Sequence, residues 1–357
     1  MRAALKWLGT ILLFLAVALC FAPTLVPPFL DRIYYRGPAS GHFDGRRFFN
    51  PGAAPARLVG SRNFFSRMAG SERSQWPARI AVSQTVPPRR VEGEAMLVTW
   101  IGHASVLVQT QGLNILTDPI WSERASPFSF IGPRRVRAPG VRFEDLPNID
   151  LVLVSHNHYD HMDLPTLRRL WQRDRPVIVT SLGNDSILRE RGIGAVARDW
   201  GGVVPIRPGV EVIVERNHHW GSRWGSDRNR ALWSAFTVRL PGGNVFFAGD
   251  TGWGGGAWAR EAARHGPFRL AIIPIGAYEP RDVMQNSHVD PEEAFRVFQT
   301  LNPVRAFGMH WGTFQLTFED IEAPPRALAA LRRRHDVPPD RFVATEVGRT
   351  FSVPRAR

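Results

Sequence analysis

The feature that most restricts the fold of this chain is a dense group of histidines directly after an apolar run. Residues 151–154 read Leu-Val-Leu-Val, and His156-Asn157-His158-Tyr159-Asp160-His161 follows. A wholly apolar run of this length is typical of a buried strand. Side chains two apart on an extended segment point the same way, so the first two histidines can bind one ion. The aspartate and the last histidine can reach a second ion, and this donor set suits zinc, iron or manganese.

Three further groups of potential ligands stand just beyond other expected strands. Functional sites of α/β folds lie at the carboxyl ends of the strands. A lone histidine at such a position is usually a hydrogen-bonded surface residue, but with the first cluster the set reaches the number of ligands that two ions require. The groups are His218-His219-Trp220 after residues 210–215, Gly249-Asp250-Thr251 after residues 245–248, and Met309-His310-Trp311 after residues 304–307.

The order of the apolar runs predicts the fold class. Short β-branched runs come first, and later strands alternate with helical patterns, which favours an α/β fold, a four-layer αββα sandwich. We expect Asp163 to cap a helix that has Pro165 in its first turn. The expected strands are residues 96–100, 105–108, 114–117, 151–154, 177–180, 210–214, 235–240, 245–248, 270–275 and 304–307, and the expected helices are residues 163–171, 257–265, 291–299 and 325–334.

The amino-terminal segment is expected to be a signal peptide or a membrane anchor. Arg2 and Lys6 precede an uncharged run from Trp7 to Leu30, whose length approaches the ~20 residues that span a bilayer. Cleavage near residues 16–18 would release a soluble domain, whereas an uncleaved segment would anchor the chain. We favour the anchor, and we expect association with a bacterial inner membrane and a periplasmic catalytic domain.

The chain is expected to divide into three parts: the targeting segment 1–30, an irregular arm over residues 31–95, and a catalytic domain over residues 96–357. The arm is rich in Pro, Gly, Arg and Phe, and it either wraps the catalytic domain or lies on a membrane. We favour an interpretation in which its phenylalanines fill satellite hydrophobic clusters; these are Phe48, Phe49, Phe64 and Phe65.

Composition limits the chemistry and the partners. The formal net charge is +13, which favours polyanions such as nucleic acid, anionic lipid or phosphorylated substrates, although scattered solvated arginines would give the same total. Cys20 is the single cysteine, so no intramolecular disulfide is possible. Metal ligands must therefore come from His and Asp, and thiol catalysis is disfavoured.

The histidine cluster resembles the H-x-H-x-D-H signature of the metallo-β-lactamase superfamily. Further segments are similar to the N-acylphosphatidylethanolamine-hydrolysing phospholipase D family, and they extend from about residue 96 to residue 318. The later segments are more distinctive than the metal motif. The similar segments are Trp100–Ser105, Leu116–Pro119, Ser155–Asp163, Phe247–Gly252, Ile275–Pro280, His288–Glu293 and His310–Phe314.

The resemblance implies two zinc ions per chain and a distribution of their ligands. One ion would bind His156, His158 and His219, and the other would bind Asp160, His161 and His310, with Asp250 bridging the two. The resemblance favours His219 because Trp220 follows it, and His218 stays an alternative.

Three residues near these ligands have other expected roles. His288 matches a family histidine near the substrate phosphate, and a supporting or helix-capping role before Asp290 is an equal alternative. His103 and Asp118 are expected to support the ligand loop by hydrogen bonding, because metal-bound imidazoles need acceptors in an outer shell.

The resemblance implies a phosphodiesterase of phospholipase D type that acts on a phospholipid. A metal-activated hydroxide would attack phosphorus and release phosphatidic acid and an N-acylethanolamine. Asp160, Asp250 and His288 are the expected catalytic residues. The alternatives are a nuclease or lactonase of the same fold and a non-catalytic membrane-attached metal-binding protein. No nucleic-acid partner is expected, because the chain shows no aromatic-basic recognition module.

Overall fold

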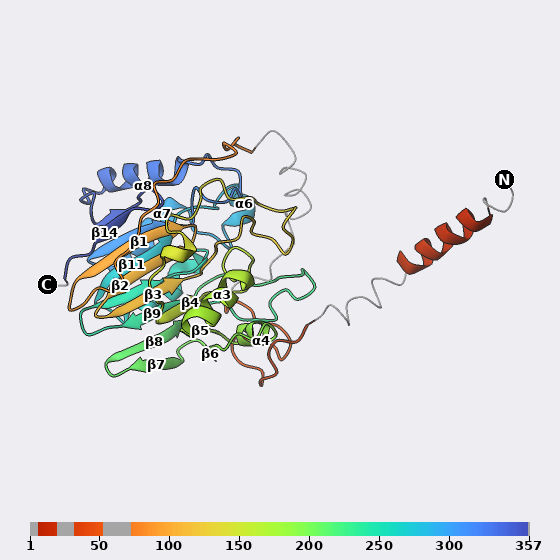
Figure 1. Ribbon diagram of the computed structural model, residues 1–357, viewed down its shortest axis with the longest axis horizontal. Coiled ribbons are helices and arrows are strands. Elements are labelled where there is room, and N and C mark those ends of the chain that lie inside the picture. Colours follow the sequence, from red (N-terminus) through yellow and green to blue (C-terminus); the bar gives the residue numbers. More distant parts are fainter. Residues whose placement is uncertain (1–5, 20–31, 53–72, 356–357) are drawn as a thin grey trace.

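Two seven-stranded sheets lie face to face at the centre of the fold (Figure 1). The computed structural model describes residues 6–19, 32–52 and 73–355. The first sheet has the order β14-β1-β2-β3-β4-β5-β6 and the second has the order β13-β12-β11-β10-β9-β8-β7. The strands of the first sheet are β1 (Met96–Gly102), β2 (Ser105–Thr110), β3 (Leu113–Thr117), β4 (Leu151–Val154), β5 (Val177–Ser181), β6 (Val196–Arg198) and β14 (Thr350–Ser352). Those of the second are β7 (Val203–Arg207), β8 (Val210–Glu215), β9 (Ala235–Arg239), β10 (Asn244–Phe247), β11 (Phe268–Pro274), β12 (Arg305–Met309) and β13 (Phe342–Val343).

Each sheet has an antiparallel part and a parallel part. In the first sheet β14, β1, β2 and β3 pair antiparallel, and β3 through β6 pair parallel. In the second sheet β7 through β10 pair antiparallel, and β10 through β13 pair parallel. The two halves of the fold therefore share one plan, although no internal repeat is visible in the sequence.

Both faces of strand β4 are apolar because each face packs in a hydrophobic core. Leu151 and Leu153 belong to the core that the two sheets share. Val152 and Val154 point the other way and pack in a second core with helix α3 (Leu164–Asp174). Side chains alternate between the faces of a strand, so a strand covered on both sides must be apolar throughout.

Helices cover the outer face of each sheet and complete the four layers (Figure 1). The first sheet is covered by α3 and α4 (Asn184–Arg189), and the second by α5 (Ala257–Ala263), α7 (Pro291–Leu301) and α8 (Ala323–Arg334). This arrangement confirms the predicted αββα sandwich. The remaining short helices are α6 (Arg281–Met284), η1 (Phe143–Asp145) and η2 (Gly254–Gly256).

Two helix starts show how the local sequence sets boundaries. Helix α7 begins with a capping box in which Asp290 accepts from the Glu293 backbone N–H, an arrangement that satisfies otherwise unpaired donors. Asp163 stands at the expected N-cap position of α3, but its side chain does not cap the helix. Its carboxylate instead accepts from the hydroxyls of Ser122 and Thr166. The predicted position of Asp163 at the start of this helix is therefore confirmed, but the side chain forms no capping bond.

The described part of the arm packs on the catalytic domain. Phe43 and Phe48 are 2% and 1% exposed, and they form a small core with Leu232 and Trp233. This packing confirms the favoured interpretation for Phe48, whereas Phe49 is 40% exposed. The predictions for Phe64 and Phe65 lie outside the described residues.

Residues 6–19 form a helix. Within the described ranges, no helix combines the length and the apolar character that a bilayer crossing requires. The rest of the predicted targeting segment, residues 1–5 and 20–30, lies outside the described residues.

Candidate metal centre

The histidine-rich loop leaves β4 at its carboxyl end and turns tightly before α3. The backbone N–H groups of His161 and Met162 both donate to the His158 carbonyl, which closes the turn. The guanidinium of Arg223 donates to the carbonyls of Asn157 and Met162 at 3.0 Å each and so ties the two ends of the loop together. Hydrogen bonds within the loop and from Arg223 therefore fix the conformation of the loop.

Three imidazoles meet on one side of this loop. His156 Nε2 lies 2.8 Å from His158 Nδ1, and His219 Nε2 lies 3.3 Å from the same His158 atom. His219 comes from the segment that follows β8. His218 points elsewhere, because its ring lies against Gly254. The structure thus brings His219, and not His218, into the cluster.

A second group gathers on the other side of the loop. His161 Nε2 lies 3.3 Å from His310 Nε2 and 3.2 Å from Asp160 Oδ2, and His310 Nε2 lies 3.6 Å from the same Asp160 oxygen. His310 follows β12 in the second sheet. The predicted ligands of the second ion therefore converge, although 149 positions separate His161 from His310.

Asp250 stands between the two groups. Its Oδ2 lies 3.0 Å from His161 Nε2, 3.1 Å from His310 Nε2 and 4.0 Å from His219 Nε2. Its Oδ1 is buried and has no hydrogen-bond partner among the described residues. One carboxylate oxygen thus faces both sets of imidazoles, and the other is free for a further contact.

The tautomers of three histidines are fixed so that lone pairs face the cluster. His161 Nδ1 donates to Asp118 Oδ2 at 2.7 Å, and His219 Nδ1 donates to the Ser287 carbonyl at 2.8 Å. Ser155 Oγ donates to Asp118 and so accepts from His156 Nδ1 at 2.8 Å. When the rings are neutral, the Nε2 atom of each therefore presents a lone pair to the cluster, as metal ligation requires.

The spacing of the donors fits metal ions. Ligand atoms about 2.0 Å from a tetrahedral zinc ion lie about 3.3 Å from one another. The separations among Asp160, His161, His310 and Asp250 run from 3.0 to 3.6 Å. The nearly complete burial of these donors would be unfavourable without a cation to balance the carboxylates. The residues present therefore fit the metal centre expected from the sequence.

Electrostatics agree with that fit. Burial lowers the pKa of His156 well below its usual range and that of His158 to about 4, so both rings are neutral and able to act as ligands. Burial alone would lower the pKa of His310, but Asp250 and Asp160 outweigh it and raise that pKa to about 9. In the metal-free chain a proton on His310 compensates the carboxylate charge that bound cations would compensate.

His103 and Asp118 have the supporting contacts expected of them. His103 Nε2 lies 2.8 Å from Asp160 Oδ2, and its ring packs against His310. Asp118 also accepts from the Ser155 backbone N–H at 2.7 Å. Sequence reasoning did not assign a role to Ser155 itself, although its place directly before the histidine cluster was a visible signal.

His288 lies at the edge of the cluster. Its Nδ1 is buried without a hydrogen-bond partner in the described part of the chain and lies 3.9 Å from Asp250 Oδ2. Burial lowers its pKa to about 4, so the ring is neutral near pH 7. The capping role considered as an alternative belongs to Asp290. His288 therefore presents an unused nitrogen to the centre.

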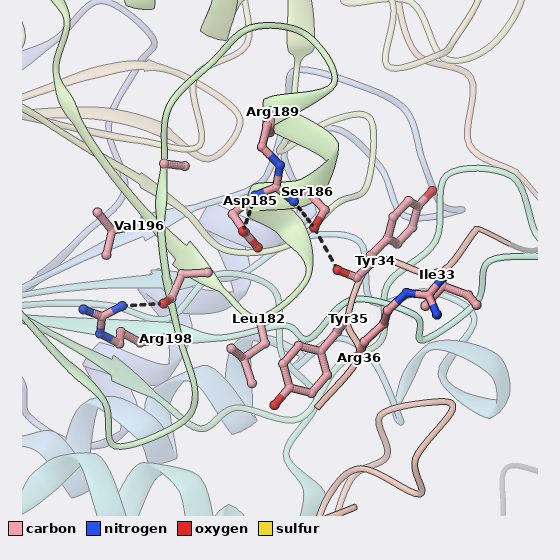
Figure 2. Close-up of a pocket in the computed structure, with 12 residues that line it drawn as sticks. Ile33, Tyr34, Tyr35, Arg36, Leu182, Asp185, Ser186, Arg189, Val196 and Arg198 are labelled. Carbon is pink, nitrogen blue, oxygen red and sulfur yellow. Dashed lines mark hydrogen bonds and ion pairs between the residues drawn. The ribbon is translucent and has the colours of Figure 1, made fainter. Parts of the chain in front are cut away.

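A separate hollow of about 630 Å³ lies between the arm and α4 (Figure 2). Its lining includes Tyr34, Arg36, Arg189 and Arg198. None of the predicted metal ligands lines this hollow. The proposed function is therefore argued from the His/Asp cluster and not from the hollow.

Comparison with known proteins identifies the family. The profile of the β-lactamase superfamily domain matches residues 113–311, more than half of the chain. N-acyl-phosphatidylethanolamine-hydrolyzing phospholipase D 1 of Caenorhabditis elegans is 35% identical over 265 residues, which cover 71% of this chain and 74% of that protein. The Saccharomyces cerevisiae relative of the same name, described as mitochondrial, is 31% identical over 258 residues, which cover 71% of this chain and 55% of that protein.

Solved structures agree in fold. Igni18, a metallo hydrolase from Ignicoccus hospitalis, has a TM-score of 0.55 and 21% identity, with 73% of this chain and 99% of that chain covered. At this identity the likeness concerns the fold alone. The family assignment rests on the sequence matches and the His/Asp clusters, and the likeness in fold agrees with it. The chain belongs to the metallo-β-lactamase superfamily, as a metal-dependent hydrolase.

Proposed function

We propose that this protein is a zinc-dependent phosphodiesterase of phospholipase D type that cleaves N-acylphosphatidylethanolamine-like lipids. The observation that carries the proposal is the position of Asp250, whose Oδ2 faces both groups of histidines. A carboxylate so placed suits a site for two cations. The names of the worm and yeast relatives support the choice of substrate.

Two sets of side chains would each hold one cation at this centre. His156, His158 and His219 would hold one zinc ion, and a second set, Asp160, His161 and His310, would hold the other, with Asp250 shared. When bound, such cations supply a Lewis acid and a hydroxide at neutral pH. Asp160 and Asp250 are committed to ligation in this proposal, so neither acts as a free general base. Iron and manganese fit the same donors.

His288 would contact the substrate phosphate. The ring is neutral near pH 7, and its Nδ1 lies 3.9 Å from Asp250 Oδ2 with no partner among the described residues. A neutral imidazole can donate a hydrogen bond to a phosphate oxygen or pass a proton to a leaving alkoxide. His288 is therefore proposed as the catalytic residue that is not a metal ligand.

A membrane-facing role is part of the same proposal. A lipid substrate is located in a membrane, so the enzyme must reach the membrane surface. The basic, apolar amino-terminal segment suits membrane association. The uncleaved anchor and the periplasmic position of the catalytic domain stay predictions. A non-catalytic metal-binding role stays an alternative, and it predicts bound metal without hydrolysis.

The test is elemental analysis of the purified chain together with hydrolysis of N-acylphosphatidylethanolamine before and after chelation. We expect about two zinc ions per chain and chelator-sensitive release of N-acylethanolamine that returns when zinc is restored. Bound metal without lipid turnover would refute the substrate and direct attention to other phosphodiesters and lactones. A folded chain that binds no metal, even with zinc added, would refute the metal centre itself.

A further inference from the structure

An apolar tip projects from the long connection between β3 and β4. Phe128, Phe130 and Ile131 are 49%, 76% and 57% exposed. The tip is an ordered turn, because the guanidinium of Arg124 donates to the Ser129 carbonyl at 3.1 Å and also to the Gly132 carbonyl. Exposed large apolar side chains that are grouped and held in place mark an interaction surface.

The tip borders a hollow of about 630 Å³ that is rich in arginine. Trp224, which is 46% exposed, also lines the hollow and adds to the apolar surface. The arginines of the lining are Arg32, Arg124, Arg168, Arg191 and Arg223, and the acidic residues are Glu123, Asp163 and Glu190. The face therefore combines apolar side chains with an excess of positive charge.

The acidic residues of this face are already engaged. Glu190 pairs with Arg32 at 2.7 Å, Glu123 pairs with Arg134 at 3.7 Å, and Asp163 accepts from neighbouring hydroxyl and backbone groups. Arg168 and Arg191 are exposed, and in the described part of the chain no carboxylate lies within 4.0 Å of either. Two guanidinium groups beside the apolar tip are thus available to an anionic partner.

We propose that this tip and the adjoining arginines form a surface that docks on a bilayer carrying anionic headgroups. Phe128, Phe130 and Ile131 would enter the interface, while Arg168 and Arg191 would contact headgroup phosphates, an arrangement of apolar anchors among cations that suits an anionic interface. The inference rests on the proposed function, because an enzyme that cleaves a membrane lipid must bind the membrane surface.

Two features favour a lipid surface over a second copy of this chain. A symmetric pairing through this face would bring the same unpaired arginines opposite one another, which is unfavourable without acidic groups to meet them. The face is also continuous with the metal loop, because Tyr159 lines the hollow and stands between His158 and Asp160 in the chain. Docking here would place the bilayer alongside the metal centre.

The start of the described arm lies on the same face. Arg32, the first residue of the described arm, lines the same hollow, and Tyr34 is fixed beside it by a hydrogen bond to Asp227. The first described contacts of the arm therefore belong to the proposed docking face.

The first experiment uses the full chain and measures binding to vesicles without turnover. Phe128→Ser, Phe130→Ser and Ile131→Ser are combined, and the matched control combines Phe49→Ser, Val86→Ser and Val203→Ser, which change apolar residues exposed elsewhere. With vesicles of phosphatidylglycerol mixed with phosphatidylcholine, we expect the tip variant to bind at least about tenfold more weakly than the control. Equal binding of the two variants, together with equal quenching in the second measurement, would overturn the proposal.

A second measurement separates docking by the tip from anchoring by the amino-terminal segment. Cys20→Ser removes the only native thiol, and Phe130→Cys or Val86→Cys carries an environment-sensitive fluorophore. On the same vesicles, nitroxide-labelled lipid should quench the probe at position 130 and not at position 86. Equal quenching, or a signal at position 130 that depends on protein concentration without vesicles, would overturn the proposal. Because no hydrolysis is measured, failure to cleave lipid would refute only the proposed function.

Discussion

Replacement of Asp118 by asparagine is expected to weaken metal binding without unfolding the chain. Asp118 is fully buried and is not one of the proposed metal ligands, so its effect must pass through His161 and, by way of Ser155, through His156. The carboxylate accepts from three donors: the Ser155 backbone, the Ser155 hydroxyl and His161 Nδ1. An asparagine keeps one carbonyl oxygen for the backbone and places an NH2 group where Oδ2 now lies.

That NH2 group would face His161 Nδ1 and, as a hydrogen-bond donor, would require a lone pair on this nitrogen. The ring would then move its proton to Nε2, the atom that faces Asp250 and His310, and would lose the lone pair that ligation needs. A hydrogen bond to a charged group contributes about 1.5–3 kcal/mol, and about 1.4 kcal/mol corresponds to a tenfold change in an equilibrium constant. We therefore expect zinc affinity to fall by about 10- to 100-fold.

The assay is competition for zinc between the protein and a chromophoric chelator, with circular dichroism as a check on the fold. Glu144→Gln is the matched control, because its carboxylate forms only an exposed pair with Arg169. The control should keep the wild-type affinity. An Asp118→Asn variant that is folded and binds zinc as tightly as the wild type would refute the argument that Asp118 fixes the tautomer of His161.

Four further outcomes follow from the same geometry. Asp250→Asn should lower lipid turnover by at least about 100-fold while circular dichroism stays unchanged, since one shared oxygen serves both ligand groups. His219→Ala should lower the zinc content and His218→Ala should not, as elemental analysis would show, and equal losses would contradict the assignment. Phe43→Ala should reduce the free energy of unfolding in urea by about 3–5 kcal/mol, because the ring is buried against the domain. Chelation should lower the melting temperature and zinc should restore it, since a metal that binds only the folded chain stabilises it.

The sequence predicted the central strands from their apolar, β-branched runs and the longer helices from their periodicity and start signals. Helix α7 has a capping box, Pro291 at its start and a buried apolar face, so its pattern is unambiguous. Strands β6, β7, β13 and β14 were not predicted, because they are edge or near-edge strands of two to five residues with partly exposed side chains. Short edge strands form by pairing with a neighbour, and their own residues carry little signal.

The candidate metal ligands could be predicted because their residue types are rare in clusters, whereas the residues that support them could be predicted only in part. The contacts of His103 and Asp118 follow from the general need of a metal-bound imidazole for an acceptor. Their backbones could not be foreseen, since His103, Asp118 and His310 have φ angles of 55°, 30° and 67°. Such conformations are unfavourable for residues other than glycine and persist where the surrounding structure holds them. No local pattern in the sequence marks them.

The centre exists because two sheets end at the same place, and Gly249 shows how closely they meet. Its φ is +60°, and an added Cβ would lie 2.7 Å from the Ser155 Cβ and 2.9 Å from the Ser234 carbonyl oxygen. A side chain there would therefore push the end of β10 away from the end of β4. Asp250 is the next residue, and its 3.0 Å contact to His161, which follows β4 in the other sheet, depends on that approach. Glycine at position 249 thus lets Asp250 of one sheet approach His161 of the other, so that the two groups of histidines lie in one cluster.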